Sequence, residues 1–139
     1  KYISSFPIKK NELEKAILDQ KNNIKKIIKI VHPLVRVSMN KFLKKNKNKK
    51  IVILDVPLLL ENKINKKNYI LIFVDAKRKD IFRRLVKRKN YNPKILNKLK
   101  KLQFFLDFKK RKSNYVIKND FKSLSVKKSV KVLKNKLLN

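Results

Sequence analysis

The most hydrophobic run in the sequence, Ile-Val-Ile-Leu-Asp-Val-Pro-Leu-Leu-Leu-Glu at residues 51–61, constrains the fold more than any other feature. Its first half is continuously apolar and rich in β-branched residues, which is typical of strands covered on both faces in parallel sheets. Pro57 has no N–H group to donate, so it ends the ladder. We therefore predict a buried parallel strand over Ile51–Val56. Ligands of such sheets gather beyond the carboxyl ends of strands, so Asp55 and Glu61 are candidate site residues.

Two more apolar runs, Tyr69–Val74 and Tyr115–Ile117, predict further strands. Apolar residues at helical spacing predict helices near residues 11–19, 22–31, 33–43, 81–86, 95–102, 104–112 and 126–137. A break is expected at His32–Pro33, because the residue before a proline is pushed out of the α region. Asn11 followed by Glu14 predicts a capping box. Strands that alternate with helices predict an α/β fold with a parallel sheet.

The absence of glycine limits the kinds of site that the chain can form. A Gly-rich phosphate loop cannot be built from these residues. Domains of this size nearly always use glycine at helix ends and tight turns. Asparagine is expected to serve at those places.

The formal net charge of +32 raises the possibility of a nucleic-acid partner. Lysine dominates the positive charge, and it is abundant together with Asn, Ile and Phe, residues that share A/T-rich codons. The basic residues are spread along the whole chain. Genome bias therefore explains the composition, and we expect only weak nonspecific binding of polyanions at low salt. A basic nucleic-acid-binding α/β module is kept as an alternative.

A length of 139 residues fits one domain with a core of its own. No apolar run is long enough to span a membrane, and the N-terminus shows no basic-then-apolar signal pattern. There is no cysteine, so neither a disulfide framework nor a thiolate metal site is expected. Cytoplasm is the default compartment.

Several short motifs, taken in order, resemble the dephospho-CoA kinase family. They are His-Pro-Leu-Val-Arg at 32–36, Val-Pro-Leu-Leu-Leu-Glu at 56–61, Phe-Val-Asp-Ala at 73–76, Arg84 with Arg88, Gln103, and Val-Ile-Lys-Asn at 116–119. The resemblance covers almost all of the chain. It implies a parallel-sheet P-loop kinase-like fold, with residues 76–112 as a lid-like helical region.

Two departures from that family's pattern stand out. The family's Gly-rich P-loop and the Asp-Ala-Asp segment that follows its second strand have no counterpart here. The resemblance therefore implies that residues 1–139 are a single incomplete kinase domain lacking its first strands and P-loop. A strand of the absent part would lie between Ile51–Val56 and Tyr69–Val74, which are expected to run parallel about 10 Å apart instead of pairing directly. Phe121 stands where the family usually has glycine, which puts the adenine-side loop in question.

The resemblance also implies a reaction, the ATP-dependent phosphorylation of the ribose 3′-hydroxyl of dephospho-CoA to give coenzyme A. ATP and Mg²⁺ are the implied cofactors, and dephospho-CoA and ATP the implied partners. We expect no specific nucleic-acid partner and no membrane association. We expect the protein to be a monomer. Without a phosphate loop, these residues are expected to be inactive alone. Another P-loop nucleoside or nucleotide kinase is a further alternative.

Arg84 and Arg88 match the family's Arg-x-x-x-Arg and are the expected catalytic and ATP-binding residues. Their spacing predicts one helix face, and a planar guanidinium binds two phosphate oxygens at once. A solvated basic face is the alternative. Arg111 and Asn119 are further expected ATP contacts, although Asn119 also fits a simple turn.

On the acceptor side, the resemblance implies substrate binding by His32, Arg36, Leu58 and Glu61. His32 beside a proline is more typical of a structural residue, and Glu61 could instead pair with a nearby lysine. Asp55, at the end of a predicted strand, could contact Mg²⁺ through a water molecule, or could simply cap a turn.

Overall fold

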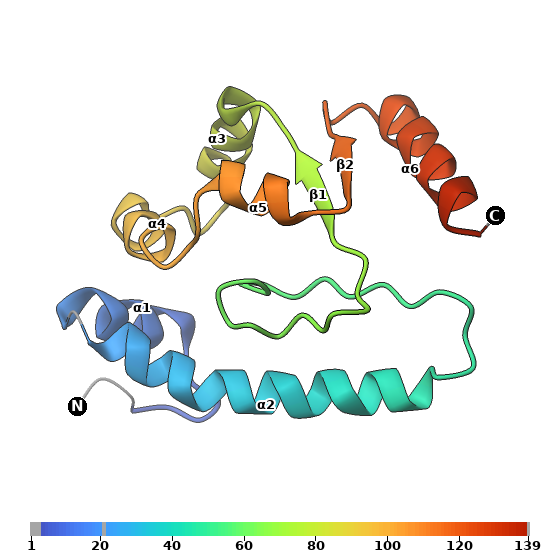
Figure 1. The fold of residues 1–139 in the computed structure, drawn as a ribbon. Coiled ribbons are helices and arrows are strands. Elements are labelled where there is room, and N and C mark those ends of the chain that lie inside the picture. Colours follow the sequence, from blue (N-terminus) through green and yellow to red (C-terminus); the bar gives the residue numbers. More distant parts are fainter. Residues whose placement is uncertain (1–3, 21, 139) are drawn as a thin grey trace. The chain divides into compact units, whose positions relative to one another are not determined.

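The computed structural model describes residues 4–20 and 22–138 (Figure 1). Its elements are, in order, α1 (Lys10–Asp19), α2 (Asn23–Lys45), β1 (Ile72–Asp75), α3 (Arg78–Val86), α4 (Pro93–Lys100), α5 (Leu106–Lys112), β2 (Tyr115–Lys118) and α6 (Ser123–Leu138). The chain divides into two compact units. Unit 1 holds the chain up to Leu59 together with Pro93–Lys100, and unit 2 holds Leu60–Asn92 and the chain from Lys101 onward. The region 76–112 thus supplies α3 and α5 to unit 2 and α4 to unit 1.

Unit 1 is a helical unit in which α1 packs against both α2 and α4. Ala16 of α1 and Ile24 and Met39 of α2 are its buried apolar residues among those described. Lys98 of α4 donates from Nζ to the carbonyl oxygens of Ile17 and Leu18, at 2.6 and 2.8 Å. These are last-turn carbonyls of α1, which lack partners within the helix. Since α1 has no basic residue in its own last turn, a lysine from far along the chain takes that role.

Helix α2 runs through Pro33 without a break, so the predicted end at His32–Pro33 is wrong. A proline inside a helix loses one hydrogen bond and crowds the preceding turn, at a cost of about 3 kcal/mol. Its φ nevertheless suits the helix. Ile24 and Ile28 before the proline and Met39 after it recur at helical spacing. One apolar face therefore extends over both halves of α2, and its packing favours a single axis.

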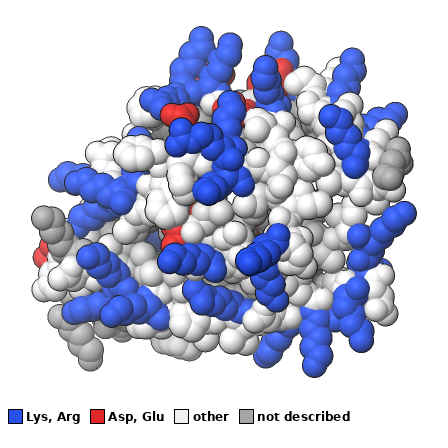
Figure 2. Space-filling view, viewed as in Figure 1, with Lys and Arg blue, Asp and Glu red and all other residues white. Residues whose placement is uncertain are grey.

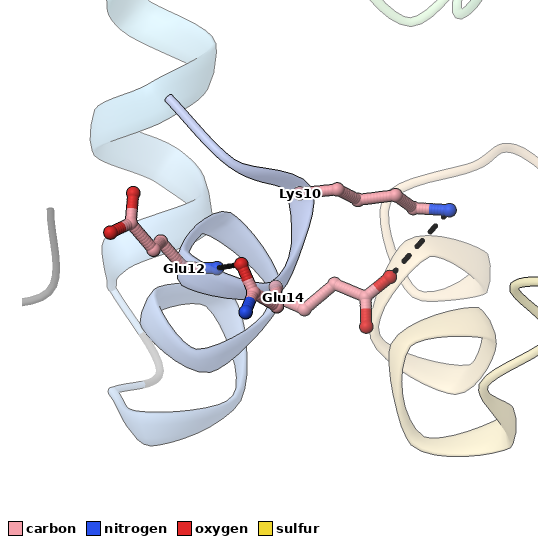
Figure 3. Close-up of polar contacts among 4 residues, drawn as sticks. Lys10, Glu12 and Glu14 are labelled. Carbon is pink, nitrogen blue, oxygen red and sulfur yellow. Dashed lines mark hydrogen bonds and ion pairs between the residues drawn. The ribbon is translucent and has the colours of Figure 1, made fainter. Parts of the chain in front are cut away.

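The first turn of α1 is held by Glu12 and not by the predicted pair of Asn11 and Glu14. Glu12 Oε2 accepts from the backbone N–H of Lys9, the residue before the helix, at 3.3 Å. Asn11 Oδ1 accepts from the Glu12 N–H at 2.9 Å. Glu14 pairs with Lys10 at 3.7 Å, and Figure 3 shows its carboxylate pointing away from that of Glu12. The helix begins before Asn11, so the predicted capping box does not form.

Unit 2 contains a parallel two-stranded sheet, in which Ile72 lies opposite Tyr115 and Asp75 opposite Lys118. Figure 1 shows β1 leading into α3 and β2 leading toward α6, which packs against β2. The backbone N–H of Leu71 donates to Asn114 Oδ1 at 2.8 Å, just before the two strands begin. The prediction of an α/β chain with a parallel sheet is confirmed. The run that begins at Tyr69 becomes a strand only from Ile72.

The residues Ile51–Val56 form no strand, and the predicted strand there is wrong. The sheet of the described residues consists of β1 and β2 alone. Ile53 is 81% exposed, so the segment is not covered on both faces either. β-branched residues favour an extended backbone, but a strand also needs a neighbour to satisfy its N–H and C=O groups. The expected distance of about 10 Å between Ile51–Val56 and Tyr69–Val74 concerns segments of two different units, so it stays a prediction.

Positive φ angles fall on Leu58 (56°), Lys63 (50°) and Phe121 (62°), and none of the described positions with positive φ is an asparagine. Asparagine does take one of the expected places, the end of α2, where Asn46 follows the last turn and its Nδ2 atom donates to the Phe42 carbonyl at 2.9 Å. The three positive-φ positions are taken by other residues. A Cβ atom is disfavoured in this region, and for a bulky residue the conformation is uncommon. Contacts of the surrounding structure must hold these three residues there.

Positive side chains cover much of the face shown in Figure 2, with the few acidic side chains lying among them. They do not gather into one stripe on this face. None of the described helices combines the length and the apolar character needed to cross a membrane.

Candidate functional site

A group of polar and aromatic side chains meets at the carboxyl ends of β1 and β2 in unit 2. We call it the strand-end cluster, and it consists of Asp75, Arg84, Lys110, Asn119 and Phe121. Lys110 Nζ lies 2.7 Å from Asp75 Oδ2, and the Asn119 N–H donates to the Asp75 carbonyl at 2.7 Å. The Arg84 Cζ atom lies 4.2 Å from the centroid of the Phe121 ring. Residues from β1, α3, α5 and the loop after β2 thus converge where α/β sheets bind ligands.

The loop between β2 and α6 is fixed by side chains that accept backbone N–H groups. Asn119 Oδ1 accepts from the Phe121 N–H at 2.9 Å, and Asp120 Oδ1 accepts from the Lys122 N–H at 2.9 Å. Asp120 Oδ1 also accepts from Ser125 Oγ at 2.7 Å. The Ser125 hydroxyl and then the Lys122 N–H lower the pKa of Asp120. Asn119 therefore acts as a turn residue here, and an additional contact to ATP stays a prediction.

Arg84 and Arg88 do not lie on one helix face, so that part of the prediction is wrong. Arg84 belongs to α3, which ends at Val86, and Arg88 lies in the turn beyond it. The Arg88 N–H donates to the Leu85 carbonyl at 3.1 Å, which is a tighter turn than the α-helix makes. The chain must leave the helix before Pro93, which restricts the residue preceding it.

Arg88 and Arg111 are both exposed. Within the part of the chain that the structure describes, neither side chain makes an ion pair or a hydrogen bond. Their guanidinium donors are directed to solvent in a unit that has few carboxylates. Both remain suited to binding an anion.

Glu61 joins the turn after Pro57 to α5. Its Oε1 atom lies 2.6 Å from Lys109 Nζ and accepts from the Phe104 N–H at 2.9 Å, and its side chain is only 8% exposed. Burial raises the pKa of Glu61, but the hydrogen bonds from Lys109 and from the backbone outweigh it, so the pKa lies below its usual range. This ion pair is the alternative named for Glu61 from the sequence, and substrate binding by Glu61 stays a prediction.

The other predicted acceptor-side residues belong to unit 1. His32 and Arg36 lie on α2, one turn apart, and Leu58 lies in the turn after Pro57. Asp55 lines an open groove of about 480 Å³ between α2 and the extended segment 53–56. The groove is otherwise mostly apolar; its walls are Val31, Leu34, Val35, Ser38, Met39, Phe42, Ile53, Leu54 and Val56. His32 and Arg36 do not line it.

The residues that could hold Mg²⁺ are few. No group of three or more His, Cys, Asp or Glu side chains in residues 4–20 and 22–138 could hold a metal ion. Mg²⁺ in phosphate-transfer sites is usually bound by one or two carboxylates, with phosphate oxygens and water completing the octahedron. A contact from Asp55 through water fits that habit without requiring a metal site made of protein alone.

Lys110 and Asp75 were missed as members of the site when only the sequence was considered. Asp75 carries a usable signal, because it ends a predicted strand and is one of 9 acidic residues. Lys110 carries none, since it is one of 41 basic residues. Phe121 was recognised only as a departure from the family's pattern, whereas the structure places its ring against Arg84.

Comparisons with known proteins point to one family. Residues 7–125 match the family model described as Dephospho-CoA kinase. The chain is similar to the dephospho-CoA kinases of Fusobacterium nucleatum (29% identical over 113 residues, 81% of this chain) and of the Wolbachia of Brugia malayi (31% over 117 residues, 83%). It is 33% identical to that of Bacillus cereus over 107 residues, 76% of this chain. These matches span 58%, 60% and 54% of the relatives' own lengths.

Proposed function

The chain belongs to the dephospho-CoA kinase family, and from this premise we propose that it serves the transfer of a phosphoryl group from ATP to the ribose 3′-hydroxyl of dephospho-CoA. The product is coenzyme A. The match over residues 7–125 is the single observation that carries the proposal. The convergence of Arg84, Lys110 and Asn119 at the carboxyl ends of two parallel strands supports it, because anionic ligands of α/β folds bind there.

On the ATP side, Arg84, Arg88, Arg111 and Asn119 are the proposed contacts, with Arg84 and Arg88 as the catalytic residues. Phosphoryl transfer requires positioning and neutralisation of the charge on the phosphate oxygens more than covalent chemistry. Exposed arginines without carboxylate partners can supply that charge and can bind two oxygens each. Mg²⁺, when bound, would neutralise further charge on the phosphates.

On the acceptor side, His32, Arg36, Leu58 and Glu61 are the proposed substrate contacts, and Asp55 is the proposed contact to Mg²⁺ through water. The groove beside α2 supports an apolar and partly acidic setting for Asp55. Leu58 supports the proposal because it lies in a turn with a positive φ of 56°, which is uncommon for a bulky residue, and such outliers cluster at functional sites.

The absence of glycine supports a proposal about activity: these 139 residues bind ligands but have no detectable turnover alone. The test joins the part of the Fusobacterium nucleatum relative that lies outside the match to this chain. The chimera should phosphorylate dephospho-CoA with ATP, and should do so only when a divalent cation is present. Magnesium-dependent turnover by the 139 residues alone would contradict the proposal.

Acceptor choice is tested with the same chimera, using nucleoside monophosphates in place of dephospho-CoA. A preference for one of those acceptors would favour another kind of P-loop kinase. We propose a monomeric cytoplasmic protein without a specific nucleic-acid partner. The spread of basic residues along the whole sequence supports the last point, since specific nucleic-acid sites concentrate their charge.

A further inference from the structure

We propose that Phe121 is a positioning residue that holds the guanidinium group of Arg84 over its ring and so prepares it for a phosphate oxyanion. The Arg84 Cζ atom lies 4.2 Å from the ring centroid, which is well inside the range of cation–π attraction. The inference rests on the proposed function of Arg84. It assigns a function to Phe121, which stands where the family usually has glycine.

Phe121 has a backbone conformation that a bulky residue does not favour, so surrounding contacts hold it there. Phe121 has φ 62°, a region that glycine enters freely and a bulky residue does not. The Asn119 carboxamide fixes this conformation by accepting the Phe121 N–H, while the Asn119 N–H is itself anchored to Asp75. A residue with no role in its side chain would be expected to be small here. Outliers of this kind cluster at functional sites.

The partner of Arg84 matters because an arginine can be held in two ways. Arg83, its neighbour in the chain, is held by an ion pair with the Asp80 carboxylate. That pairing uses N–H donors and cancels charge. No carboxylate of the described residues pairs with Arg84, which instead lies over an aromatic ring.

An aromatic ring restrains a guanidinium without a full negative charge, so Arg84 keeps its charge and its hydrogen-bonding capacity. The entropy of ordering the long side chain is then lost on folding and not on binding. Such a guanidinium group can bind two oxygens of one phosphate of ATP at once. Phe121 therefore acts on ATP through Arg84 and does not touch the reacting atoms.

The experiment measures ATP binding to the purified chain by calorimetry. Phe121→Leu, which keeps bulk and removes the aromatic face, should raise the Kd for ATP by about twofold to fivefold, the range given by the cation–π energies of exposed sites. Phe121→Tyr, which keeps an aromatic ring, should bind ATP with the same Kd as the unaltered chain. Phe121→Gly should weaken ATP binding like Phe121→Leu, although it relieves the backbone and should not lower the melting temperature.

A second measurement reads the geometry without ligand. The ring current of Phe121 should displace the Arg84 side-chain proton resonances upfield, and the displacement should vanish in Phe121→Leu but persist in Phe121→Tyr. Arg83→Ala serves as the matched control, because it removes an adjacent guanidinium already paired with Asp80. It should leave the Arg84 resonances and the Kd for ATP unchanged.

The outcomes separate this inference from the function on which it rests. If Arg84→Ala weakens ATP binding and Phe121→Leu does not, the positioning role is wrong and the proposed function stands. Undisplaced Arg84 resonances in the unaltered chain would also overturn the positioning role. If the unaltered chain binds no ATP, the proposed ATP side fails and this inference fails with it.

Discussion

Glu61 and Lys109 form an ion pair of 2.6 Å whose two side chains are only 8% and 20% exposed. The pair links the turn after Pro57 to α5, across 48 positions of sequence that contain β1, α3 and α4. The Phe104 N–H binds the same carboxylate oxygen. Removing one partner of such a pair leaves a charge with little access to water, and that is more costly than losing an exposed pair.

We therefore expect Lys109→Met to lower the free energy of unfolding by about 2 kcal/mol, measured with urea. Lys110→Met is the matched control. It breaks a pair of similar length, with Asp75, whose side chains are 47% and 35% exposed, and should cost at most about 1 kcal/mol. Equal losses in the two variants would show that the Glu61 pair is no more sheltered than a surface pair.

The pH dependence of that pair has a definite sign. The folded-state pKa of Glu61 is lowered from its ordinary value of 4.5, so its contribution to stability is fully present above pH 4.5. The contribution is lost as the pH falls through the lower, folded-state pKa. Lys109→Met should remove most of this dependence, so the stabilities of the variant and the unaltered chain should approach each other in acid.

Glu12 provides a second titration that can be followed by NMR. The Ser4 hydroxyl, and after it the Ser5 hydroxyl, lower the pKa of Glu12 to about 2; the two hydroxyl oxygens lie 2.6 and 2.8 Å from its carboxylate. Ser4→Ala should raise the pKa toward 4.5. The capping contribution of Glu12 is present above pH 4.5 and lost toward pH 2. Ser125→Ala, which acts on Asp120, should leave the pKa of Glu12 unchanged.

Pro33 offers a test of the continuous helix. Because α2 passes through this residue, Pro33→Ala should restore the missing hydrogen bond and raise the free energy of unfolding by about 1–3 kcal/mol. Leu34→Ala, one residue further along the same helix, is the control and should give no such gain. A melting temperature that falls in Pro33→Ala would indicate that α2 is interrupted at this point in solution.

Arg88 tests the proposed ATP side without a change in stability. In the chimera described above, Arg88→Ala should lower turnover at least about tenfold, since one charged hydrogen-bonding group contributes about 1.5–3 kcal/mol. Its melting temperature should not change, because the side chain is exposed and makes no hydrogen bond or ion pair among the described residues. Lys87→Ala and Lys89→Ala are the neighbouring controls. Normal turnover in Arg88→Ala would remove Arg88 from the catalytic residues.

The sequence predicts those parts of the fold whose signal is local. The apolar spacing of Val126, Val130 and Leu133 anticipates α6, and the run Tyr115–Ile117 anticipates β2. A helix forms its hydrogen bonds within one segment, so its pattern is sufficient to identify it. The parallel pairing of β1 and β2 also follows, because helices separate the strands along the chain.

The failures concern features that depend on distant partners. Ile51–Val56 has strand composition but no neighbouring strand in the described chain, and composition cannot supply one. Pro33 looked like a helix end because the stabilising apolar face on both sides of it is a property of packing. The contact between Arg84 and Phe121 joins residues 37 positions apart, and the expectation of a small residue after Asn119–Asp120 concealed it.

The partly exposed segment Ile51–Val56, which pairs with no strand among the described residues, has a consequence for colloidal behaviour. Ile53 is 81% exposed, and extended apolar backbone without a neighbour can pair with another copy of the same chain. A net charge of +32 opposes that approach by mutual repulsion. The repulsion acts over about 10 Å at 0.1 M salt and only about 3 Å at 1 M. Light scattering should therefore rise as salt is added, and a charged residue in place of Ile53 should suppress the rise.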